Sequence, residues 1–582
     1  MTISLPRGKR LLMGQSRNEL VLSIVLGALI GLVVVAFLLL TGRIAARMYP
    51  AGGAPWRRIL VPTLGSLVTG YFLYRYFPQA RGSGVPQTKF ALYVEDGRIS
   101  FLTVIGKFFL CAGSLATGIA LGREGPCVQI GAGIASVIGR RLGVTKEQVK
   151  SLVPVGAAAA LAAAFNTPIA AVLFTLEEIT GDLHAPVLGA AVVSSATAWM
   201  VLHLVLGDQP LFHVAGYKLV HPIEFAIYAV LGVVGGFGSV CFVKLLLWLR
   251  ERFMRLPSWT VWLQPVAGGL TVGLIGWFAP EVMGVGYNYV EQVLNGNLIL
   301  ETVALLAILK IIASAVCYSS GNAGGIFGPS LFIGAMIGGS IGSIAHSLLP
   351  AYTAQPGAYA LVGMGAVFAG IVRVPITSVI MVFEVTRDYT IIVPLMISNL
   401  ISFFISYGLQ REPIYEALAR QEGVYLPTAE SRALLGRKQV LQAMHTDTKA
   451  LPSQLTVAEA LDLAERSGLK SLPVTDKSGL CAVIGKIDLQ SAMAQGWGEK
   501  DLADVIGHYF SWNGKDPTKF SYVHSDHSLA VALERMGASG SDMLPVVSRG
   551  NLRQLLGIIT LDDILASYGV AKPFEAAAET EK

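Results

Sequence analysis

Residues 125–132 read GPCVQIGA and residues 328–335 read GPSLFIGA, so one Gly-Pro motif occurs twice, at an offset of 203 positions. An offset of 207 relates three further pairs, which are Pro168 and Pro375, Val172 and Val379, and Glu177 and Glu384. So many matches at nearly constant offsets would not arise by chance. The sequence therefore predicts two homologous halves, about 20–207 and 224–410, and duplicated halves usually place a substrate site at their interface.

The composition divides the chain into an apolar body and a soluble one. Of its 582 residues, 53% are hydrophobic and 14% charged, whereas soluble domains carry about 25% charge. Charge is about twice as dense after residue 424 as before it. The first uncharged run, 20–42, is long enough to span a bilayer, and basic residues before it predict a cytoplasmic N-terminus. We expect a polytopic α-helical membrane protein with broken helices and a soluble C-terminal region.

The expected domain boundaries follow from these shifts in composition and from a second repeat, of 72 positions, after Gly423. Each unit of that repeat reads as a helix, a strand beginning Leu-Pro-Val, a turn, a second strand and a closing helix. The predicted parts are an N-terminal segment (1–19), a membrane domain (20–423), a linker (424–436), two α/β units (437–498 and 499–571) and a disordered tail (572–582).

Several classes of function are disfavoured. The five cysteines show no paired spacing, which argues against disulfides and zinc, and His508, His524 and His527 lack partners at a ligand spacing, so no metal site is expected. The net charge of +6 is unclustered, which argues against nucleic-acid binding. No nucleophile–base constellation indicates an enzyme. A membrane-anchored receptor needs no broken helices, and a divalent-cation transporter needs clustered carboxylates.

Four Gly/Pro-rich clusters interrupt the apolar body, at 82–86, 122–126, 321–329 and 412–415. In each, proline stands where a helix can start. Helix starts aimed at one point would offer free N–H groups and positive dipole ends to a small anion, without the tight grip of lysines. The alternative is that each cluster only kinks a crowded helix.

Three of these clusters resemble the signature motifs of the CLC family of chloride channels and chloride/proton exchangers. They are Gly82-Ser83-Gly84-Val85-Pro86, Gly122-Arg123-Glu124-Gly125-Pro126 and Gly325-Ile326-Phe327-Gly328-Pro329, followed by a Tyr-bearing helix and paired CBS domains. The resemblance, to the prokaryotic type, implies two inverted repeats of tilted helices, and a homodimer with one permeation path per subunit. It also implies chloride held by Ser83, Tyr415 and the amides of Ile326 and Phe327. Gln87 departs from the glutamate that is common at its position.

Glu124 is the first candidate for function, because an acid beside a helix start in a charge-poor membrane segment is costly. The alternative is an ion pair with Arg123, although neighbouring residues on a helix point apart and Arg123 is expected to be structural. The resemblance implies that Glu124 is the external gate and proton carrier. When ionised it occupies an anion site, and when protonated it swings out.

Glu178 is the second candidate. Its neighbour Glu177 repeats as Glu384, which favours a shared structural role such as capping, whereas Val385 stands opposite Glu178. An acid without a counterpart at a buried helix end suits a proton relay, and a solvated helix end is the alternative. The resemblance implies an internal proton acceptor and favours a chloride/proton antiporter over a passive voltage- or pH-gated channel. Lys107 and its repeat Lys310 are expected to be structural charges or to contribute to the anion field.

The second α/β unit carries a stretch, 557–563, that resembles the CBS nucleotide motif. There Thr560 and Asp563 would contact an adenine nucleotide, whereas the first unit has Gly485 in place of the threonine. The alternative is a dimerising module without ligand, and no cofactor is expected to be required. The expected partners are chloride, protons, membrane lipid and a second copy of the chain. The expected location is the bacterial inner membrane, with the CBS domains cytoplasmic.

Overall fold

A computed structural model gives the fold of the chain. It describes residues 7–50, 52–183, 186–208, 210–214, 217, 219–423, 438–446, 450–467, 469, 471–506, 520–539 and 541–567, with backbone alone for 7–18, 538 and 565. The chain forms two compact units that divide between Leu426 and Pro427. Each unit is considered by itself. The predicted linker and tail lie outside the described residues.

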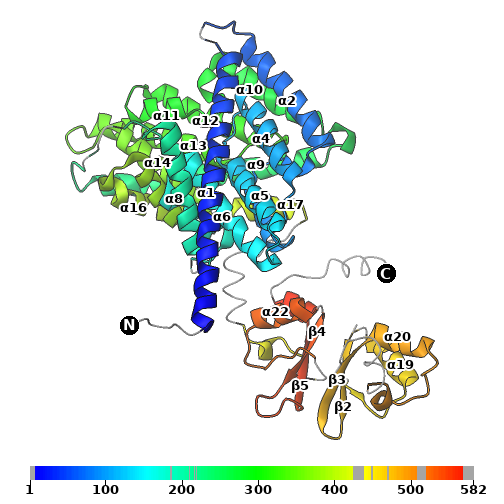
Figure 1. The fold of residues 1–582 in the computed structure, drawn as a ribbon. Helices are drawn as coiled ribbons and strands as arrows, with labels where there is room; N and C mark the ends of the chain where they lie inside the picture. The colour runs from blue at the N-terminus through cyan, green and yellow to red at the C-terminus, as the bar shows by residue number, and fades with distance from the viewer. Residues whose placement is uncertain are drawn as a thin grey trace, which may run out of the picture. The chain divides into compact units, whose positions relative to one another are not determined.

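The first unit is helical, and Figure 1 shows its helices packed at many angles around one another. The helices of its first half are α1 (Arg7–Met48), α2 (Arg57–Arg75), η1 (Pro78–Ala80), α3 (Val85–Tyr93), α4 (Phe101–Ala116), α5 (Glu124–Arg141), α6 (Lys146–Phe165), α7 (Pro168–Phe174), a π-helix (Thr175–Thr180) and α8 (Leu188–Leu206). Those of its second half are α9 (Glu224–Met254), η3 (Ser258–Thr260), α10 (Gln264–Phe278), η4 (Pro280–Val282), α11 (Tyr287–Leu294), α12 (Leu300–Ser319), α13 (Phe327–Leu348), α14 (Pro356–Val372), α15 (Pro375–Thr386), η5 (Tyr389–Ile391), α16 (Ile392–Leu409) and α17 (Ile414–Gln421).

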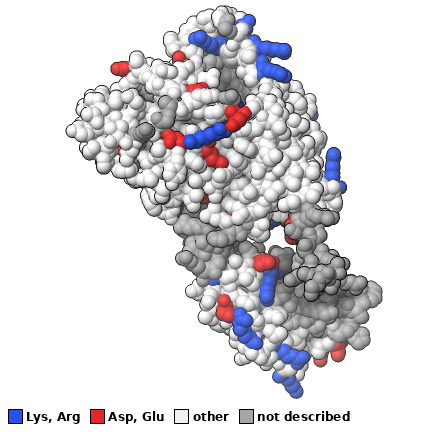
Figure 2. Space-filling model, turned by 60° about the vertical axis from the view of Figure 1, so that its left-hand side comes forward, with Lys and Arg blue, Asp and Glu red and all other residues white. Residues whose placement is uncertain are grey.

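Within the described residues, seven helical ranges are long and apolar enough to cross a membrane. The rest are shorter, such as α4, α14 and α15, and the face of this unit in Figure 2 is largely uncharged. The predicted first span, 20–42, lies inside a longer helix, Arg7–Met48, of which Glu19–Met48 is apolar enough to cross a membrane. Hydropathy marks the part that crosses lipid, whereas a helix continues until a breaker, here next to Pro50.

The two halves are inverted repeats, as the contacts of α7 and α15 demonstrate. Glu177, just after α7, accepts hydrogen bonds from the first amides of α15, those of Ile376 (3.3 Å) and Thr377 (2.9 Å). Glu384, near the end of α15, accepts from Ile169 (2.9 Å) and Ala170 (2.6 Å) at the start of α7. Each helix end therefore meets the other helix's start, so the equivalent helices run antiparallel. Glu177 and Glu384 therefore each cap a helix start of the other half, as expected.

Close helix packing is equally symmetric. A Cβ on Gly131 of α5 would lie 2.3 Å from the carbonyl oxygen of Gly156 on α6, and one on Gly334 of α13 would lie 2.4 Å from that of Gly363 on α14. Only glycine fits at these crossings, which lets the backbones touch. The glycine content of the apolar body thus serves interhelical contact in both halves.

The second unit contains two small α/β units in the predicted order, but not with the predicted bounds: Val440, expected in the first, packs in the core of the second, and Leu502, expected in the second, packs in the core of the first. The first has β1 (Leu451–Pro452), α19 (Val457–Ser467), β2 (Ser471–Asp476), β3 (Gly479–Gly485) and α20 (Lys486–Ala494); the second has η6 (Val440–Gln442), α22 (Leu529–Ser539), β4 (Met543–Val547), β5 (Leu555–Thr560) and α23 (Leu561–Ser567). Strand β2 pairs parallel with β1 and antiparallel with β3, and β4 pairs antiparallel with β5. The amide of Leu480 donates to the carbonyl of Arg553 (2.6 Å), which joins the two units as expected.

Both reciprocal caps should stabilise the membrane unit to a similar extent. We expect Glu177→Gln and Glu384→Gln each to lower the free energy of unfolding by about 1–2 kcal/mol, because each weakens a charged cap of the opposite half. Thermal unfolding in detergent measures this, with exposed Glu147→Gln as the control. A loss for one variant but not for the other would contradict an equivalent role.

Candidate functional site

A helix begins inside each of the four Gly/Pro clusters, as predicted. These starts belong to α3, α5, α13 and α17, and α3 packs against both α5 and α17, while α5 contacts α13. At the centre, the amide of Gly122 donates to the carbonyl of Gly325 and the amide of Gly325 donates to that of Gly122, both at 2.7 Å. This backbone pair holds the starts of α5 and α13 side by side.

Two buried hydroxyls lie beside these helix starts. Ser83 precedes α3, Tyr415 is in the first turn of α17, and both side chains are fully buried. The two hydroxyls face each other, and neither forms a hydrogen bond of ordinary geometry to a described residue. The Ser83 oxygen is so near α5 that a Cβ on Gly125 would lie 2.6 Å from it. Buried polar groups are ordinarily satisfied. Two unsatisfied donors at one place are suited to hold a desolvated anion.

Ile326 and Phe327 contribute their backbones. Ile326 is the N-cap of α13 and Phe327 its first residue, so the Phe327 amide has no acceptor within the helix. The Phe327 ring fixes this end of the helix, since it packs against three other aromatic rings. These are Phe165, Phe174 and Phe368, with centroids at 5.5, 4.9 and 4.6 Å.

Glu124 is completely buried at the start of α5. One carboxylate oxygen accepts a hydrogen bond from the Tyr287 hydroxyl and lies 3.7 Å from Nε of Arg123. The other oxygen makes no hydrogen bond to a described residue. The expectation that Arg123 points away from Glu124 is wrong, because its guanidinium lies over the ring of Tyr287, whose hydroxyl binds Glu124, and is thereby held near the carboxylate.

Tyr287 is a contact of Glu124 that the sequence analysis missed. Gly284-Val285-Gly286 precedes it and repeats Gly82-Ser83-Gly84 at an offset of 202, with all four glycines in the left-handed region. The loop before α11 is therefore the counterpart of the one that carries Ser83. That match was the available signal, since the repeat brings both loops to the same centre.

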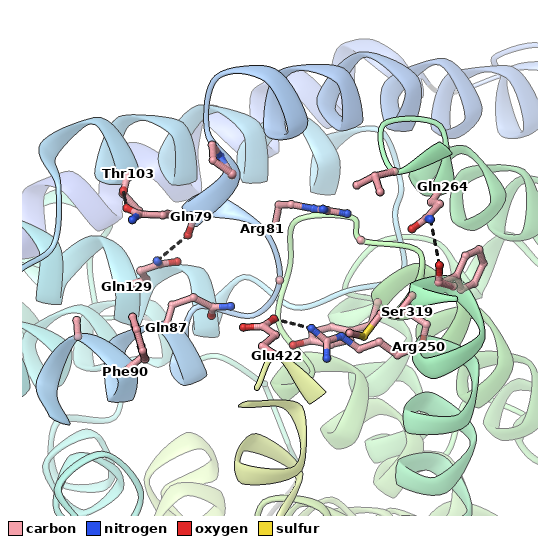
Figure 3. A pocket seen from close by; sticks show the side chains of 18 of the residues that line it. Gln79, Arg81, Gln87, Phe90, Thr103, Gln129, Arg250, Gln264, Ser319 and Glu422 are labelled. Carbon is pink, nitrogen blue, oxygen red and sulfur yellow. Dashed lines mark hydrogen bonds and ion pairs between the residues drawn. The ribbon is translucent and has the colours of Figure 1, made fainter. Parts of the chain in front are cut away.

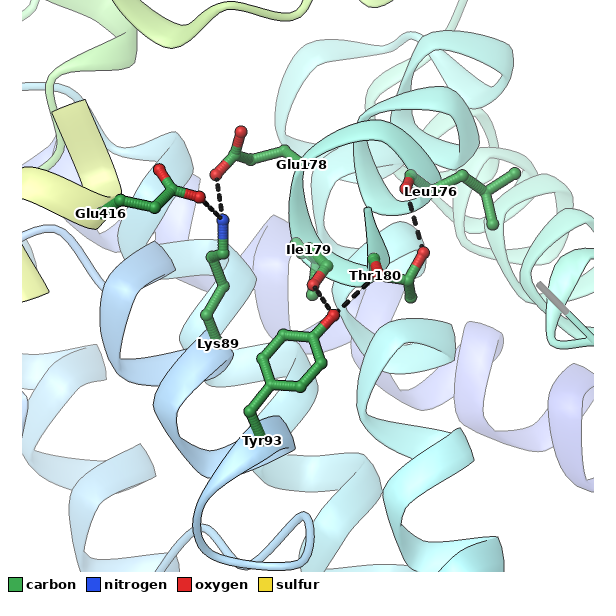
Figure 4. Close-up of polar contacts among 7 residues, drawn as sticks. All are labelled: Lys89, Tyr93, Leu176, Glu178, Ile179, Thr180 and Glu416. Carbon is green, nitrogen blue, oxygen red and sulfur yellow. Dashed lines mark hydrogen bonds and ion pairs between the residues drawn. The ribbon is translucent and has the colours of Figure 1, made fainter. Parts of the chain in front are cut away.

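Glu178 is 6% exposed and belongs to a buried cluster of charge (Figure 4). Its carboxylate accepts from Nζ of Lys89 at 2.7 Å, and the same Nζ donates to Glu416 at 2.5 Å. Glu178 is thus not a solvated helix end. It lies in the π-helix, whereas its counterpart Val385 lies in the regular helix α15, and π-helical turns are frequent at functional sites.

Lys107 and Lys310 hold backbone loops in equivalent ways. Nζ of Lys107 donates to the carbonyls of Ala80 (3.1 Å) and Gly82 (2.6 Å), just before α3. Nζ of Lys310 donates to those of Val282 (2.8 Å) and Gly284 (2.7 Å), just before α11. Both lysines are buried and bind carbonyl oxygens, which fits the structural role expected for them.

A cavity of about 600 Å³ reaches Gly82, next to Ser83 (Figure 3). Arg81 and Arg250 both line it, and Arg250 forms an ion pair with Glu422 at 2.5 Å. Its arginines outnumber its carboxylates, so the cavity favours anions. Gln87 also lines it and accepts from the amide of Gly84 (2.9 Å), so this residue caps α3 without adding a negative charge.

In the second unit, Thr560 and Asp563 form a capping box at the start of α23. The Thr560 hydroxyl donates to the Asp563 carboxylate at 2.7 Å, which also contacts His445 at 2.7 Å. Asp488 caps the amide of Gly485 in the same way (3.2 Å) but finds no hydroxyl there. His524 bonds the Val547 carbonyl (2.9 Å), and His508 lies outside the described residues. The described residues contain no group of three or more His, Cys, Asp or Glu side chains placed to hold a metal ion.

Comparison with known proteins places this geometry in a family. The family described as "Voltage gated chloride channel" matches residues 65–407, which is more than half of the chain. The chain belongs to this family, the CLC family. Its second unit contains two CBS domains, matched over 438–495 and 516–569. Its membrane unit is that of a CLC-type transport protein, related to proteins named for chloride transport and antiport.

Two curated relatives match the membrane unit of this CLC protein. A putative chloride channel protein, ClcB-like, from Ralstonia nicotianae is 34% identical over 385 residues, covering 65% of this chain and 89% of that protein. The H(+)/Cl(−) exchange transporter ClcA of Vibrio campbellii is 31% identical over 366 residues, covering 62% of this chain and 78% of that protein.

Solved structures agree on the fold. A slow cyanobacterial Cl−/H+ antiporter has a TM-score of 0.65 and 26% identity, and the match covers 69% of this chain and 97% of the antiporter. A eukaryotic CLC transporter has a TM-score of 0.67 and 20% identity, and the match covers 95% of this chain and 98% of that chain. At this identity the second likeness shows the fold alone, across both units.

The hydrogen bond from Tyr287 should hold Glu124 in its buried position. We expect Tyr287→Phe to raise the rate of chloride flux in proteoliposomes at a fixed pH by about tenfold, because the carboxylate loses a hydrogen bond that contributes about 1.5–3 kcal/mol to its buried position and so competes less well with chloride. Tyr289→Phe, on the same helix, is the matched control, and an unchanged rate in Tyr287→Phe would contradict this role.

Proposed function

We propose that this CLC protein is a secondary active chloride/proton antiporter. The observation that carries the proposal is that two buried carboxylates, Glu124 and Glu178, lie near helix starts that also bear two unsatisfied buried hydroxyls. A passive channel needs an anion path but no second buried acid for protons. The relatives whose names include exchange or antiport support this choice, whereas the ClcB-like relative is named a channel.

Chloride binds where the hydroxyls of Ser83 and Tyr415 and the amides of Ile326 and Phe327 face the same region. Hydroxyl and amide donors stabilise an anion without the full charge of a lysine, so that it can leave again. The arginine-lined cavity that reaches Gly82 serves as the approach from the cytoplasm. Lys107 and Lys310 fix the loops and do not contact the anion directly.

Glu124 and Glu178 carry protons between the two sides. The ionised Glu124 carboxylate occupies an anion position at the start of α5, and protonation removes its charge and releases it, so that chloride takes its place. Glu178 receives protons from the cytoplasmic side. The exchange is coupled because one carboxylate competes with chloride and also binds the proton.

The surroundings of the transporter follow from the same proposal. The chain is a homodimer in the bacterial inner membrane, with its N-terminus and CBS domains cytoplasmic and with no nucleic-acid partner. Transport requires no cofactor. Adenine nucleotide binding at the CBS pair stays a prediction. Only the second CBS domain has both groups that such a ligand would contact, the Thr560 hydroxyl and the Asp563 carboxylate. The first CBS domain has Gly485, which lacks a hydroxyl, in place of the threonine.

Paired measurement of chloride and proton flux in proteoliposomes tests the function. The wild type should move protons against their gradient when driven by chloride. Glu178→Gln should retain chloride flux and lose proton flux, because the neutral amide binds no proton at that site. Glu124→Ala should lose proton movement and also the pH dependence of chloride flux.

Contrary results are equally clear. A wild type that moves chloride but never moves protons against a gradient is a channel. Coupled proton transport that persists in Glu124→Ala would show that this residue is not the proton carrier. Loss of folding in that variant would favour a structural ion pair with Arg123, and Arg123→Gln should then be equally unstable.

The Ser83 hydroxyl should contribute directly to chloride affinity. We expect Ser83→Ala to weaken chloride binding by about tenfold or more, since losing a hydrogen bond to a charged partner costs about 1.5–3 kcal/mol. Calorimetric titration of the purified protein with chloride measures the change. Ser114→Ala, which removes another buried hydroxyl in the same half, is the control, and equal affinities in the two variants would place the anion elsewhere.

A further inference from the structure

Glu178 shares its lysine with a second carboxylate. Lys89 on α3 is 2% exposed, and its Nζ lies between Glu178 (2.7 Å) and Glu416 (2.5 Å), which is 8% exposed on α17 (Figure 4). The second oxygen of Glu416 is buried and makes no hydrogen bond to a described residue. A surface ion pair would leave that oxygen to water, so this arrangement places an extra acceptor inside the protein.

The charges of this cluster do not balance when both acids are ionised. One lysine then faces two carboxylates, so the cluster carries one net negative charge. When Glu178 takes up a proton, Lys89 and Glu416 remain as a neutral pair. The same step without Glu416 would leave a buried lysine with no counter-charge, which is strongly unfavourable.

Among the described residues, the ionisable groups around Glu178 are Lys89 on α3, Glu416 and the Tyr415 phenol on α17, and the neighbouring Glu177. The Tyr93 hydroxyl on α3 also reaches the π-helix, where it donates to the carbonyls of Ile179 and Thr180. Glu177 is held by the first amides of α15, and Tyr415 is a neutral phenol beside Ser83. Glu416 is therefore the charged group best placed to change the proton affinity of Glu178 through Lys89.

We propose that Glu416 is a positioning residue of the inner proton site, which competes with Glu178 for Lys89 and keeps the lysine neutralised whenever Glu178 is protonated. This inference rests on the proposed antiport function. In each cycle a proton from the cytoplasm binds a Glu178 oxygen, Lys89 gives up its contact with Glu178 and keeps the one with Glu416, and passage of the proton on towards Glu124 restores the shared arrangement. No bond other than that to the proton forms or breaks.

The test is the pH at which proton flux is half-maximal, measured together with chloride flux in proteoliposomes. Glu416→Gln should move this half-point to lower pH by about one unit or more, because Lys89 then stabilises the ionised form of Glu178 alone. Lys89→Gln should move it in the opposite direction, because two carboxylates then face each other without a cation. Opposite shifts from two partners of one contact would not arise from a merely structural role.

A double-variant comparison repeats the test in a second background. Removing the Glu416 charge should lower the half-maximal pH in the Lys89→Gln background as well. The double variant Lys89→Gln/Glu416→Gln should therefore have a lower half-maximal pH than Lys89→Gln alone. This comparison decides the matter if Glu416→Gln alone does not fold. Glu416→Asp should lie near wild type because it keeps the charge. The matched control is Glu251→Gln on α9, whose carboxylate forms an exposed ion pair with Arg255.

Equal half-points in wild type, Glu416→Gln and Lys89→Gln would overturn the proposal, and so would shifts of the same sign. Those results leave the antiport function intact, provided that wild type moves protons and Glu178→Gln does not. A wild type without proton transport would instead refute the function on which the inference rests.

Discussion

The membrane unit depends on backbone and carboxylate contacts that are exchanged between its two halves. Gly122 and Gly325 bond each other's carbonyls, and Glu177 and Glu384 each cap the first turn of the other half's helix. Because every such contact has a mirror in the chain, the two halves meet along an approximate twofold axis. The starts of α5 and α13 are thereby brought together at the interior of the unit, where helix dipoles have few other charges to compete with.

The two halves differ at a few equivalent positions, and these differences concern polar residues of the site. The Gly-Ser-Gly loop before α3 carries a hydroxyl, whereas the equivalent Gly-Val-Gly loop before α11 leads into Tyr287, which binds Glu124. Glu178 stands in a π-helix, and Val385 at the matching place stands in a regular helix. The repeated residues support the scaffold, and the unmatched ones carry the polar chemistry. A difference between two copies of one fold is therefore informative in itself.

The sequence allowed the repeat, the helix starts and the burial of Glu124 and Glu178 to be predicted, because Gly-Pro pairs and acids in apolar surroundings are local signals. Lys89 and Glu416 could not be found in that way, because each becomes significant only when α3 or α17 packs against a helix distant in sequence. Tyr287 was missed for a different reason, since the Gly-Val-Gly repeat before it was present in the sequence but was not recognised. The direction of the Arg123 side chain was also predicted wrongly, because its guanidinium packs on the ring of Tyr287, a residue distant in sequence.

The antiparallel pairing of α7 and α15 also has a consequence for biosynthesis. When the first half leaves the ribosome, the first amides of α7 await Glu384, and Glu177 awaits amides about two hundred residues downstream. Inside a bilayer no water is available to satisfy them in the meantime. The first half must therefore stay in a partly solvated or protected state until the second half is inserted. Assembly of the membrane unit is thus a late, concerted event, although its helices are made one after another.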